Sequence, residues 1–546
     1  MILSKIISKI FLRGYGYRYY PQRFKKNFCL SRDKNNIPTK GLKRVKRKFY
    51  IKLSNVTVHT NADQIWESNF HINDREDLSN LHRWSWALKL LSKEKQLNND
   101  LINFIELSFL KWSQKFGSEK IDKRKIYFEP YNISERISNY VILVKLNIIK
   151  PNKEIEDSLI KQFNFLIKNI EVYKGKLSNH ALNNLRAIIL FSSYQKARNL
   201  ENYGLNFFIY LLKKKIDSNG FFKFGSSNYQ LIFTRWLLDV YFLASNSLAK
   251  KKLKKFVNKA LNAICFFSIN KKLVTPNFGN ISPDFELSWL IDFFQKKNNF
   301  FLKRYKNKYK FSFKFNNLKS GEWFKIQKNS FTIFARNPKF CGFDFNHSHN
   351  DTFHFVMYYK NNQIFIDKGR YDYSFQSLKE SLSSCAHNSF KINKLPINDD
   401  LLQNKLFVKL FFKDIKNINF HITQNKIDKL KMSLKDKDKD MERVIQIVKS
   451  KIYIKDKIKS NFVIKKLYIF FNLYLNENYP ISKKRKIIDI GNNLNMQFRH
   501  DQVFSLNQEK EYFSNEYGKR EKFMKLCLLF KNFKHLSFQT VISIKK

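Results

Sequence analysis

The sequence contains few cysteines, few glycines and prolines, few acidic residues and no long apolar run. The absence of an apolar run near the roughly 18 residues of a membrane-spanning helix excludes an integral helical membrane protein. The chain has 546 residues and is 43% hydrophobic, which excludes a disordered protein and allows two or three domains with their own cores. A disulfide scaffold and a thiolate zinc finger are also excluded, because the five cysteines are far apart and form no CxxC pair: Cys29, Cys265, Cys341, Cys385 and Cys527.

Acidic residues are scarce beside basic ones. The chain has 45 Asp and Glu against 102 Lys and Arg, a formal net charge of +57. Such an excess is typical of proteins that bind nucleic acid, acidic lipid or acidic polysaccharide. However, most of the cations are Lys, and they are spread along the whole chain among abundant Asn, Ile, Phe and Tyr. This is equally typical of an A+T-rich coding sequence, so the charge permits an anionic partner without establishing one.

The N-terminal segment has two interpretations. Met1 to Leu12 is apolar but is interrupted by Lys5 and Lys9, and residues 13–26 are basic and rich in Tyr. A secretory signal requires an uninterrupted apolar centre and a small-residue cleavage site, and neither is clear here. The segment is either an amphipathic helix in peripheral contact with a membrane or a frayed basic leader, and we assign residues 1–60 to a basic leader.

Hydrophobic periodicity divides the rest of the chain into two parts. Apolar residues recur at helical spacing between residues 63 and 303, clearly so in four segments: 78–91, 101–116, 182–193 and 231–245. From about residue 311 apolar and polar residues alternate, with hairpins predicted around residues 328–330 and 361–362, strands over 444–458 and 462–475, and a charged loop at 435–440. Helices followed by strands predict a multidomain α+β protein, with a helical array over 61–310 and a sandwich-like antiparallel β domain over 311–546.

The densest polar cluster is Asn-His-Ser-His-Asn-Asp at residues 346–351. His347 and His349 are two apart and would leave the same face of a strand. Asp367 follows an apolar strand, and His387 comes 20 residues after it. Two imidazoles and a carboxylate converging from three adjacent strands would match a zinc site. The alternative is that a histidine caps a loop and Asp367 begins a turn before Gly369, and both interpretations stay open.

These segments resemble the C-terminal domain of the heparinase II/III-like polysaccharide lyases. Residues 347–351, 365–371 and 386–389 are similar to the family's HGHAD, VDPGTY and RAHNT patterns, with Ser348 in place of Gly and Lys368 in place of Pro. Helical-half segments resemble family motifs in the same order: 129–139, 178–184 and 220–239. The resemblance covers residues 60 to 475 and implies an N-terminal (α/α) toroid followed by an antiparallel β-sandwich.

The resemblance also implies an activity. Such a lyase cleaves a uronic-acid-containing acidic polysaccharide by β-elimination, in a cleft between toroid and β-sandwich. Asn179 and His180 would hold the uronate carboxyl group. Tyr229 would be the acid, and also the base if nearby cations lower its pKa from about 10. His347 would supply the other proton-transfer group.

Further roles follow from the same resemblance. Arg136 would bind the substrate anion, and a structural Zn²⁺ on His349, Asp367 and His387 would fix the orientation of His347. A water-activating role for the zinc stays open, because one coordination position would be free. Each role has a plainer alternative. Asn179 and His180 could cap the helix that follows, Tyr229 could be a buried tyrosine bonded to backbone, and Arg136 could pair with Glu135 or a helix end.

Three functions are weighed. The first is the lyase. The second is a protein of the same fold that binds or trims cell-envelope or capsule polysaccharide during its synthesis. The third, a nucleic-acid-binding protein, ranks last because the Lys residues are not interleaved with aromatics on any recognisable module. The resemblance implies a periplasmic or cell-envelope location, while the unclear export signal leaves the cytoplasm open. Oligomeric state and the identity of the polysaccharide are not predicted.

Overall fold

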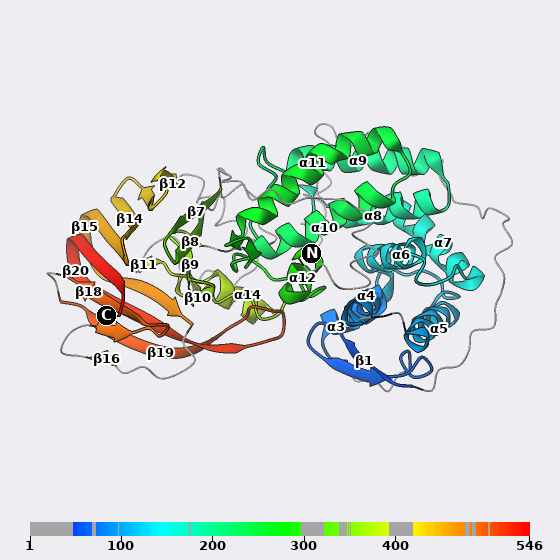
Figure 1. Cartoon of the computed structure of the whole chain (residues 1–546), viewed down its shortest axis with the longest axis horizontal. Coiled ribbons are helices and arrows are strands. Elements are labelled where there is room, and N and C mark those ends of the chain that lie inside the picture. Colours follow the sequence, from blue (N-terminus) through cyan, green and yellow to red (C-terminus); the bar gives the residue numbers. More distant parts are fainter. Residues whose placement is uncertain are drawn as a thin grey trace, which may run out of the picture. The chain divides into compact units, whose positions relative to one another are not determined.

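The computed structural model describes two compact units, neither of which is continuous in sequence (Figure 1). The first comprises Met1–Phe222, Leu231–Leu261 and Pro283–Phe313, and the second comprises Lys223–Gln230, Asn262–Ser282 and Lys314–Lys546. Within these ranges the structure describes residues 47–67, 72–94, 96, 98–173, 176–295, 322–337, 347, 349, 351–392, 419–474, 481–482, 487–500 and 503–545. The predicted leader up to residue 46, with its membrane-surface helix, and the predicted domain junction near residue 310 lie outside the described residues.

The first unit is mainly helical. A hairpin of β1 (Phe49–Lys52) and β2 (Thr57–Thr60) precedes its helices. These are α3 (Arg75–Arg83), α4 (Ser85–Lys93), α5 (Asn99–Phe116), η1 (Ile126–Phe128), α6 (Pro130–Lys145), α7 (Lys153–Lys168), α8 (Asn179–Tyr194), α9 (Arg198–Lys215), α10 (Ser227–Leu243), α11 (Ser247–Phe266) and α12 (Leu287–Gln295), with a small hairpin of β3 (Val172–Tyr173) and β4 (Lys176–Leu177) before α8. The start of α10, up to Gln230, and the end of α11, from Asn262, belong to the second unit. Helices are therefore confirmed in all four predicted segments, and their circular arrangement as a toroid stays a prediction.

One predicted helix is broken. Residues 78–91 form the end of α3 and most of α4, and the two helices meet at Trp84, whose φ is 60°. The Trp84 side chain is fully buried and stacks on Phe109, with ring centroids 3.9 Å apart. Since a left-handed backbone is costly for a bulky residue, packing of this ring against α5 outweighs the continuous helical periodicity.

The second unit is built on one large antiparallel sheet. Its strands are β7 (Trp323–Lys328), β8 (Phe331–Arg336), β9 (Phe355–Tyr359), β10 (Asn362–Phe365), β11 (Phe390–Ile392), β12 (Asn419–Lys426), β13 (Lys429–Lys435), β14 (Lys439–Val448), β15 (Lys451–Leu473), β16 (Ile481–Ser482), β17 (Ile487–Asp489), β18 (Leu494–Arg499), β19 (Ser505–Phe513) and β20 (Glu521–Ile544). The main path runs β16-β17-β18-β20-β15-β10-β9-β8-β7, with β14 and β11 also paired to β15 and β19 to β20. The long strands β15 and β20 run side by side along much of their length (Figure 1). A small hairpin of β5 (Ser268–Ile269) and β6 (Lys272–Leu273), helix α14 (Phe375–Leu382) and a short turn η2 (Ser384–Ala386) complete the unit.

The two predicted hairpins are confirmed as β7–β8 and β9–β10. The strand predicted over 444–458 is wrong: β14 ends at Val448, a turn with Lys449 at φ 51° follows, and β15 then runs unbroken from Lys451 to Leu473. A register shift between Lys459 and Ile464 lets β15 continue through the polar residues that suggested a break. A sandwich arrangement of this sheet stays a prediction.

Candidate active site and metal centre

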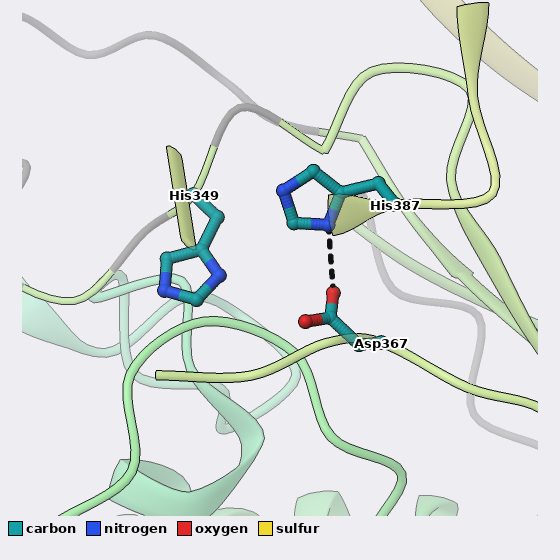
Figure 2. Close-up of side chains that lie close together, drawn as sticks. All are labelled: His349, Asp367 and His387. Carbon is teal, nitrogen blue, oxygen red and sulfur yellow. Dashed lines mark hydrogen bonds and ion pairs between the residues drawn. The ribbon is translucent and has the colours of Figure 1, made fainter. Parts of the chain in front are cut away.

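His349, Asp367 and His387 come together in the second unit (Figure 2). All three side chains are buried, and one ligand atom from each lies within 4.8 Å of the others. Their predicted origin on three adjacent strands is wrong, because Asp367 follows β10, His387 follows η2, and His349 lies in the segment before β9. A backbone hydrogen bond from Lys368 N to Ala386 O (3.0 Å) holds two of these loop segments side by side. The sheet therefore positions the cluster through the segments at its strand ends.

The hydrogen bonds around the cluster leave lone pairs for a metal. His349 Nε2 lies 3.0 Å from Asn280 Oδ1, which can only accept, so Nε2 carries the proton and Nδ1 holds a lone pair. Within the described part of the chain, His349 Nδ1 and His387 Nε2 are buried without a hydrogen-bond partner. Burial lowers the pKa of His349 to about 3 and keeps the imidazole neutral, as a metal ligand must be.

Asp367 supplies the negative charge of the cluster. Its Oδ2 accepts from His387 Nδ1 at 2.9 Å, the contact drawn in Figure 2. Burial alone would raise the pKa of Asp367, but His387 and His354 hold it well below its usual range. Two imidazoles and a carboxylate are a donor set typical of zinc, so these residues fit the predicted Zn²⁺.

His354 is a part of this cluster that the sequence analysis missed. Its Nδ1 accepts from the backbone N–H of Asn388 (3.0 Å), so its Nε2 carries the proton, and that atom lies 3.0 Å from Asp367 Oδ2. His354 is therefore a group that orients the carboxylate and not a further ligand. The available signal was a single histidine in the apolar run from Phe353 to Tyr359.

Arg443 and Asn388 fix the loop that carries His387. The Asn388 side-chain amide donates to Phe355 O (2.7 Å) and Ile366 O (3.0 Å), and Arg443 Nη1 donates to Asn388 O (2.7 Å). Arg443 and Asp456, on the paired strands β14 and β15, form a two-bond ion pair of 2.7 and 3.0 Å with both side chains fully buried. The buried Arg443–Asp456 pair thus helps to hold the loop that carries His387 on the sheet.

Replacing Arg443 alone should destabilise the protein strongly. Arg443→Leu leaves Asp456 buried without its partner, and removing one member of a buried ion pair costs about 3–5 kcal/mol. Urea denaturation measures the loss of unfolding free energy in the transition of the second unit. The double variant Arg443→Leu/Asp456→Leu is the matched control. We expect the double variant to recover most of the loss. A single variant as stable as the wild type would contradict the role given to this pair.

Tyr229 and His347 also lie together in the second unit. Tyr229 is near the start of α10, and its ring stacks on the imidazole of His347 with centroids 3.6 Å apart. Neither residue lies in a strand, so the predicted strand position of His347 is wrong. Asn280 joins this pair to the metal cluster, because its N–H donates to His347 O (2.8 Å) and its Oδ1 bonds His349. Gly279 is required beside it, since a Cβ there would lie 2.3 Å from His347 O and its φ is +73°.

Two residues beside Tyr229 were missed from the sequence. The hydroxyl of Tyr373 lies 2.7 Å from the hydroxyl of Tyr229, so the two phenols share one hydrogen bond. The Arg370 guanidinium lies over the Tyr373 ring, 4.7 Å from its centroid. Burial lowers the pKa of Arg370, and negative charge on Tyr373 or Tyr229 would oppose that shift.

Asn179 and His180 are placed in the first unit. Ser178 is the N-cap of α8 and accepts from Ala181 N (3.3 Å), so the alternative in which Asn179 and His180 cap this helix is wrong. His180 Nδ1 lies 2.9 Å from Glu171 Oε1, and its side chain is 45% exposed. With Nδ1 facing Glu171, Nε2 is the nitrogen left for another group.

The structure contradicts the substrate-binding role predicted for Arg136. The side chain is fully buried, and its guanidinium donates to Gln162 Oε1 (2.9 Å), His82 O (2.7 Å) and Tyr127 O (2.7 Å). It also lies 4.0 Å from the ring centroid of Trp112. Arg136 therefore links parts of the helical unit internally. Its bond to His82 O in the last turn of α3 confirms the predicted pairing with a helix end, and the predicted pairing with Glu135 is wrong.

Comparison with known proteins places the second unit in a family. Residues 312–544 match the family described as heparinase II/III-like, C-terminal. The chain carries a heparinase II/III-like domain. The family predicted from residues 347–351, 365–371 and 386–389 is thereby confirmed. No curated protein matches the chain in sequence.

Solved structures similar to this chain share its fold at low identity. A heparinase III crystal structure matches with a TM-score of 0.66 and 13% identity, covering 96% of this chain and 88% of the other. The heparan sulfate lyase HepC from Pedobacter heparinus matches with a TM-score of 0.54 and 15% identity, covering 99% of this chain and 88% of the other.

Along the described ranges, none of the helices is both long enough and apolar enough to cross a membrane.

Proposed function

We propose that this heparinase II/III-like protein is a lyase that cleaves a uronic-acid-containing acidic polysaccharide by β-elimination. The observation that carries the proposal is the Tyr229–Tyr373 hydroxyl pair, 2.7 Å apart, with His347 stacked on one ring and Arg370 over the other. The family match and the fold shared with heparinase III structures support it.

The reaction needs groups of this kind. A base removes the proton from C5 of the uronate, the C4–O4 bond breaks, a C4=C5 double bond forms, and an acid returns a proton to the departing O4 oxygen. Neutralising the uronate carboxylate makes the C5 proton easier to remove, because charge then spreads into the carboxyl group. No water is consumed, so the chemistry requires proton carriers rather than an activated water.

In the proposal the two phenols carry the protons. Tyr229 donates to O4, and Tyr373, acting as a phenolate beside the Arg370 guanidinium, takes the C5 proton or relays it to Tyr229 through their shared hydrogen bond. His347 holds the Tyr229 ring by stacking and remains the alternative proton-transfer group. In this proposal the acid and base roles are divided between two phenols and are not both carried by Tyr229.

Asn179 and His180 are proposed to hold the uronate carboxyl group by donated hydrogen bonds. The position of His180 Nδ1 against Glu171 supports this role, because it fixes the ring while Nε2 stays available. A cleft between the helical and β domains as the place of reaction stays a prediction, as does a periplasmic or cell-envelope location.

Zinc, when bound by His349, Asp367 and His387, would act as a structural tie between three loop segments. Asn280 bonds both the His349 side chain and the His347 backbone. The proposed metal therefore supports the orientation of His347 without taking part in proton transfer.

The test of the proposal uses the purified full chain on a panel of acidic polysaccharides with carboxylates only, or with carboxylates and sulfates. The readout is the ultraviolet absorbance of the conjugated double bond that elimination creates. We expect a rise with at least one uronate polymer and none with neutral polysaccharides. If folded, zinc-loaded protein gives no rise in absorbance with any polymer, the lyase hypothesis is overturned. The second hypothesis, a protein that binds or trims envelope polysaccharide, would then be favoured.

A Tyr373→Phe variant tests the phenol pair. It removes one hydroxyl and keeps the ring beneath Arg370, so we expect kcat to fall about 10²-fold or more with little change in KM. The matched control is Tyr468→Phe, on β15 of the same unit and without a proposed role. Equal kcat in wild type and Tyr373→Phe would remove Tyr373 from the chemistry.

A further inference from the structure

A pocket of about 420 Å³ lies in the second unit, lined by groups that neither the metal cluster nor the phenol pair uses. This volume falls within the range of about 300–1,000 Å³ that small-molecule sites occupy. Its walls are formed by Lys368, Gly369 and Tyr371, and by residues of helix α14, of strand β19 and of the segment before β20. Backbone hydrogen bonds from Ser514 N to Lys368 O (2.9 Å) and from Gly518 N to Tyr371 O (2.8 Å) tie these walls together. The pocket is thus a formed part of the unit.

Positive charge is in excess around the pocket. Lys368 Nζ lies 2.9 Å from Glu511 and 3.6 Å from Glu380, so both acidic side chains of the lining already have a cation. Lys510 and Arg520 also line the pocket and are exposed, and neither has an acidic partner among the residues that the structure describes. Two cations are therefore available to an incoming anion.

Aromatic rings complete the lining. The Arg520 guanidinium lies over Tyr371, 4.1 Å from the ring centroid, which holds the charge in one orientation. Tyr512 is 50% exposed, so its ring can pack against the apolar face of a sugar while its hydroxyl stays in water. Ser377 adds a hydroxyl group to the wall. Oriented cations beside exposed aromatic rings are the groups that would recognise a saccharide carrying carboxylate or sulfate.

The pocket shares one chain segment with the proposed reaction site. Between residues 367 and 373, Lys368 and Tyr371 line the pocket. Tyr373 bonds the Tyr229 hydroxyl, Arg370 lies over the Tyr373 ring, and Asp367 belongs to the candidate metal cluster. A sugar held in the pocket would therefore contact the segment that positions the phenol pair.

We propose that this pocket is an accessory binding site for an acidic saccharide, separate from the site of bond cleavage. This proposal rests on the proposed function in one respect: the ligand is taken to belong to the same class of acidic polysaccharide. Lys510 and Arg520 bind its carboxylate or sulfate groups, and Tyr512 packs against a ring of the sugar.

The test compares two double variants in a Tyr229→Phe background, so that bound oligosaccharide is not cleaved. Lys510→Ala/Arg520→Ala removes the two pocket cations, and Lys531→Ala/Lys534→Ala removes two exposed cations of β20 that do not line the pocket. The probes are decasaccharides of hyaluronan, with carboxylates only, and of heparin, with sulfates as well. Isothermal titration at about 0.15 M salt measures Kd, because screening at that salt suppresses general attraction to a chain of charge +57.

We expect the pocket variant to bind at least one probe about tenfold or more weakly, as loss of two charge-assisted contacts requires, and the β20 variant to bind almost as well as its parent. Equal weakening in both variants, unchanged binding in the pocket variant, or no binding of either probe to the parent would each overturn the proposal. The absorbance assay separates this from the lyase. If only the pocket variant loses binding and the wild type shows no elimination, the accessory site stands and the lyase is overturned. If the wild type shows elimination and the pocket variant binds as its parent does, the lyase stands and the accessory site is overturned.

Discussion

Tyr229→Phe should lower kcat by roughly 10²–10⁴-fold on whichever polymer the wild type cleaves, the range expected for loss of a group that transfers a proton in the transition state. The substitution removes only the hydroxyl that lies 2.7 Å from Tyr373 and keeps the ring that stacks on His347. The unfolding temperature should therefore change little while the rate of absorbance increase collapses.

The control for this variant is a tyrosine of the same helical region with no proposed role. Tyr241→Phe, further along α10, should keep the wild-type kcat. A double variant, Tyr229→Phe/Tyr373→Phe, should be scarcely slower than either single variant, because residues that act as one unit lose their effect together. Full activity of Tyr229→Phe would remove Tyr229 from the chemistry and would transfer the acid role to His347.

Removal of Asp367 should have the largest effect on the metal centre. Asp367→Ala deletes one of three ligands and leaves His387 and His354 without the carboxylate that both now face. We expect the purified variant to contain no stoichiometric zinc, and its unfolding free energy to fall by about 3–5 kcal/mol, as for a broken buried ion pair. Metal content by mass spectrometry and denaturant unfolding check both parts.

His354→Gln is the comparison variant, since His354 orients Asp367 without being placed as a ligand. Loss of such an outer contact weakens metal affinity by about 10–100-fold, so this variant should still bind zinc when the metal is in excess. Zinc retained by Asp367→Ala, or wild-type stability unaffected by a strong chelator, would contradict a metal centre at these residues.

The sequence allowed the order of the elements to be predicted because the evidence for it is local. Periodicity located the helices and the hairpins β7–β8 and β9–β10 without knowledge of tertiary contacts. It failed where packing decides. Trp84 adopts φ 60° because its ring is buried against Phe109, and β15 continues past its polar middle because β20 pairs with it on both sides of that stretch.

The site divides in the same way. His349, Asp367 and His387 could be selected by residue type and resemblance, and the structure brings them within ligand distance. His354, Arg370 and Tyr373 could not, because their roles depend on which loop folds against Tyr229 and Asp367. For Arg136, the sequence motif identified the family, but the substrate-binding role inferred from it was wrong. The sequence alone does not distinguish an arginine that faces substrate from one that is fully buried and bonded to Gln162, as Arg136 is.

The central claim, cleavage by elimination, is tested most directly by the mass of the products. Elimination divides the polymer without adding water, so the masses of the two fragments sum to that of the substrate, and one fragment carries the new double bond. Mass spectrometry of a size-defined uronate oligosaccharide, digested in water enriched in oxygen-18, should show fragments with no added water and no heavy oxygen. Fragments that carry one added water labelled with oxygen-18 per cleavage would identify a hydrolase and contradict the account.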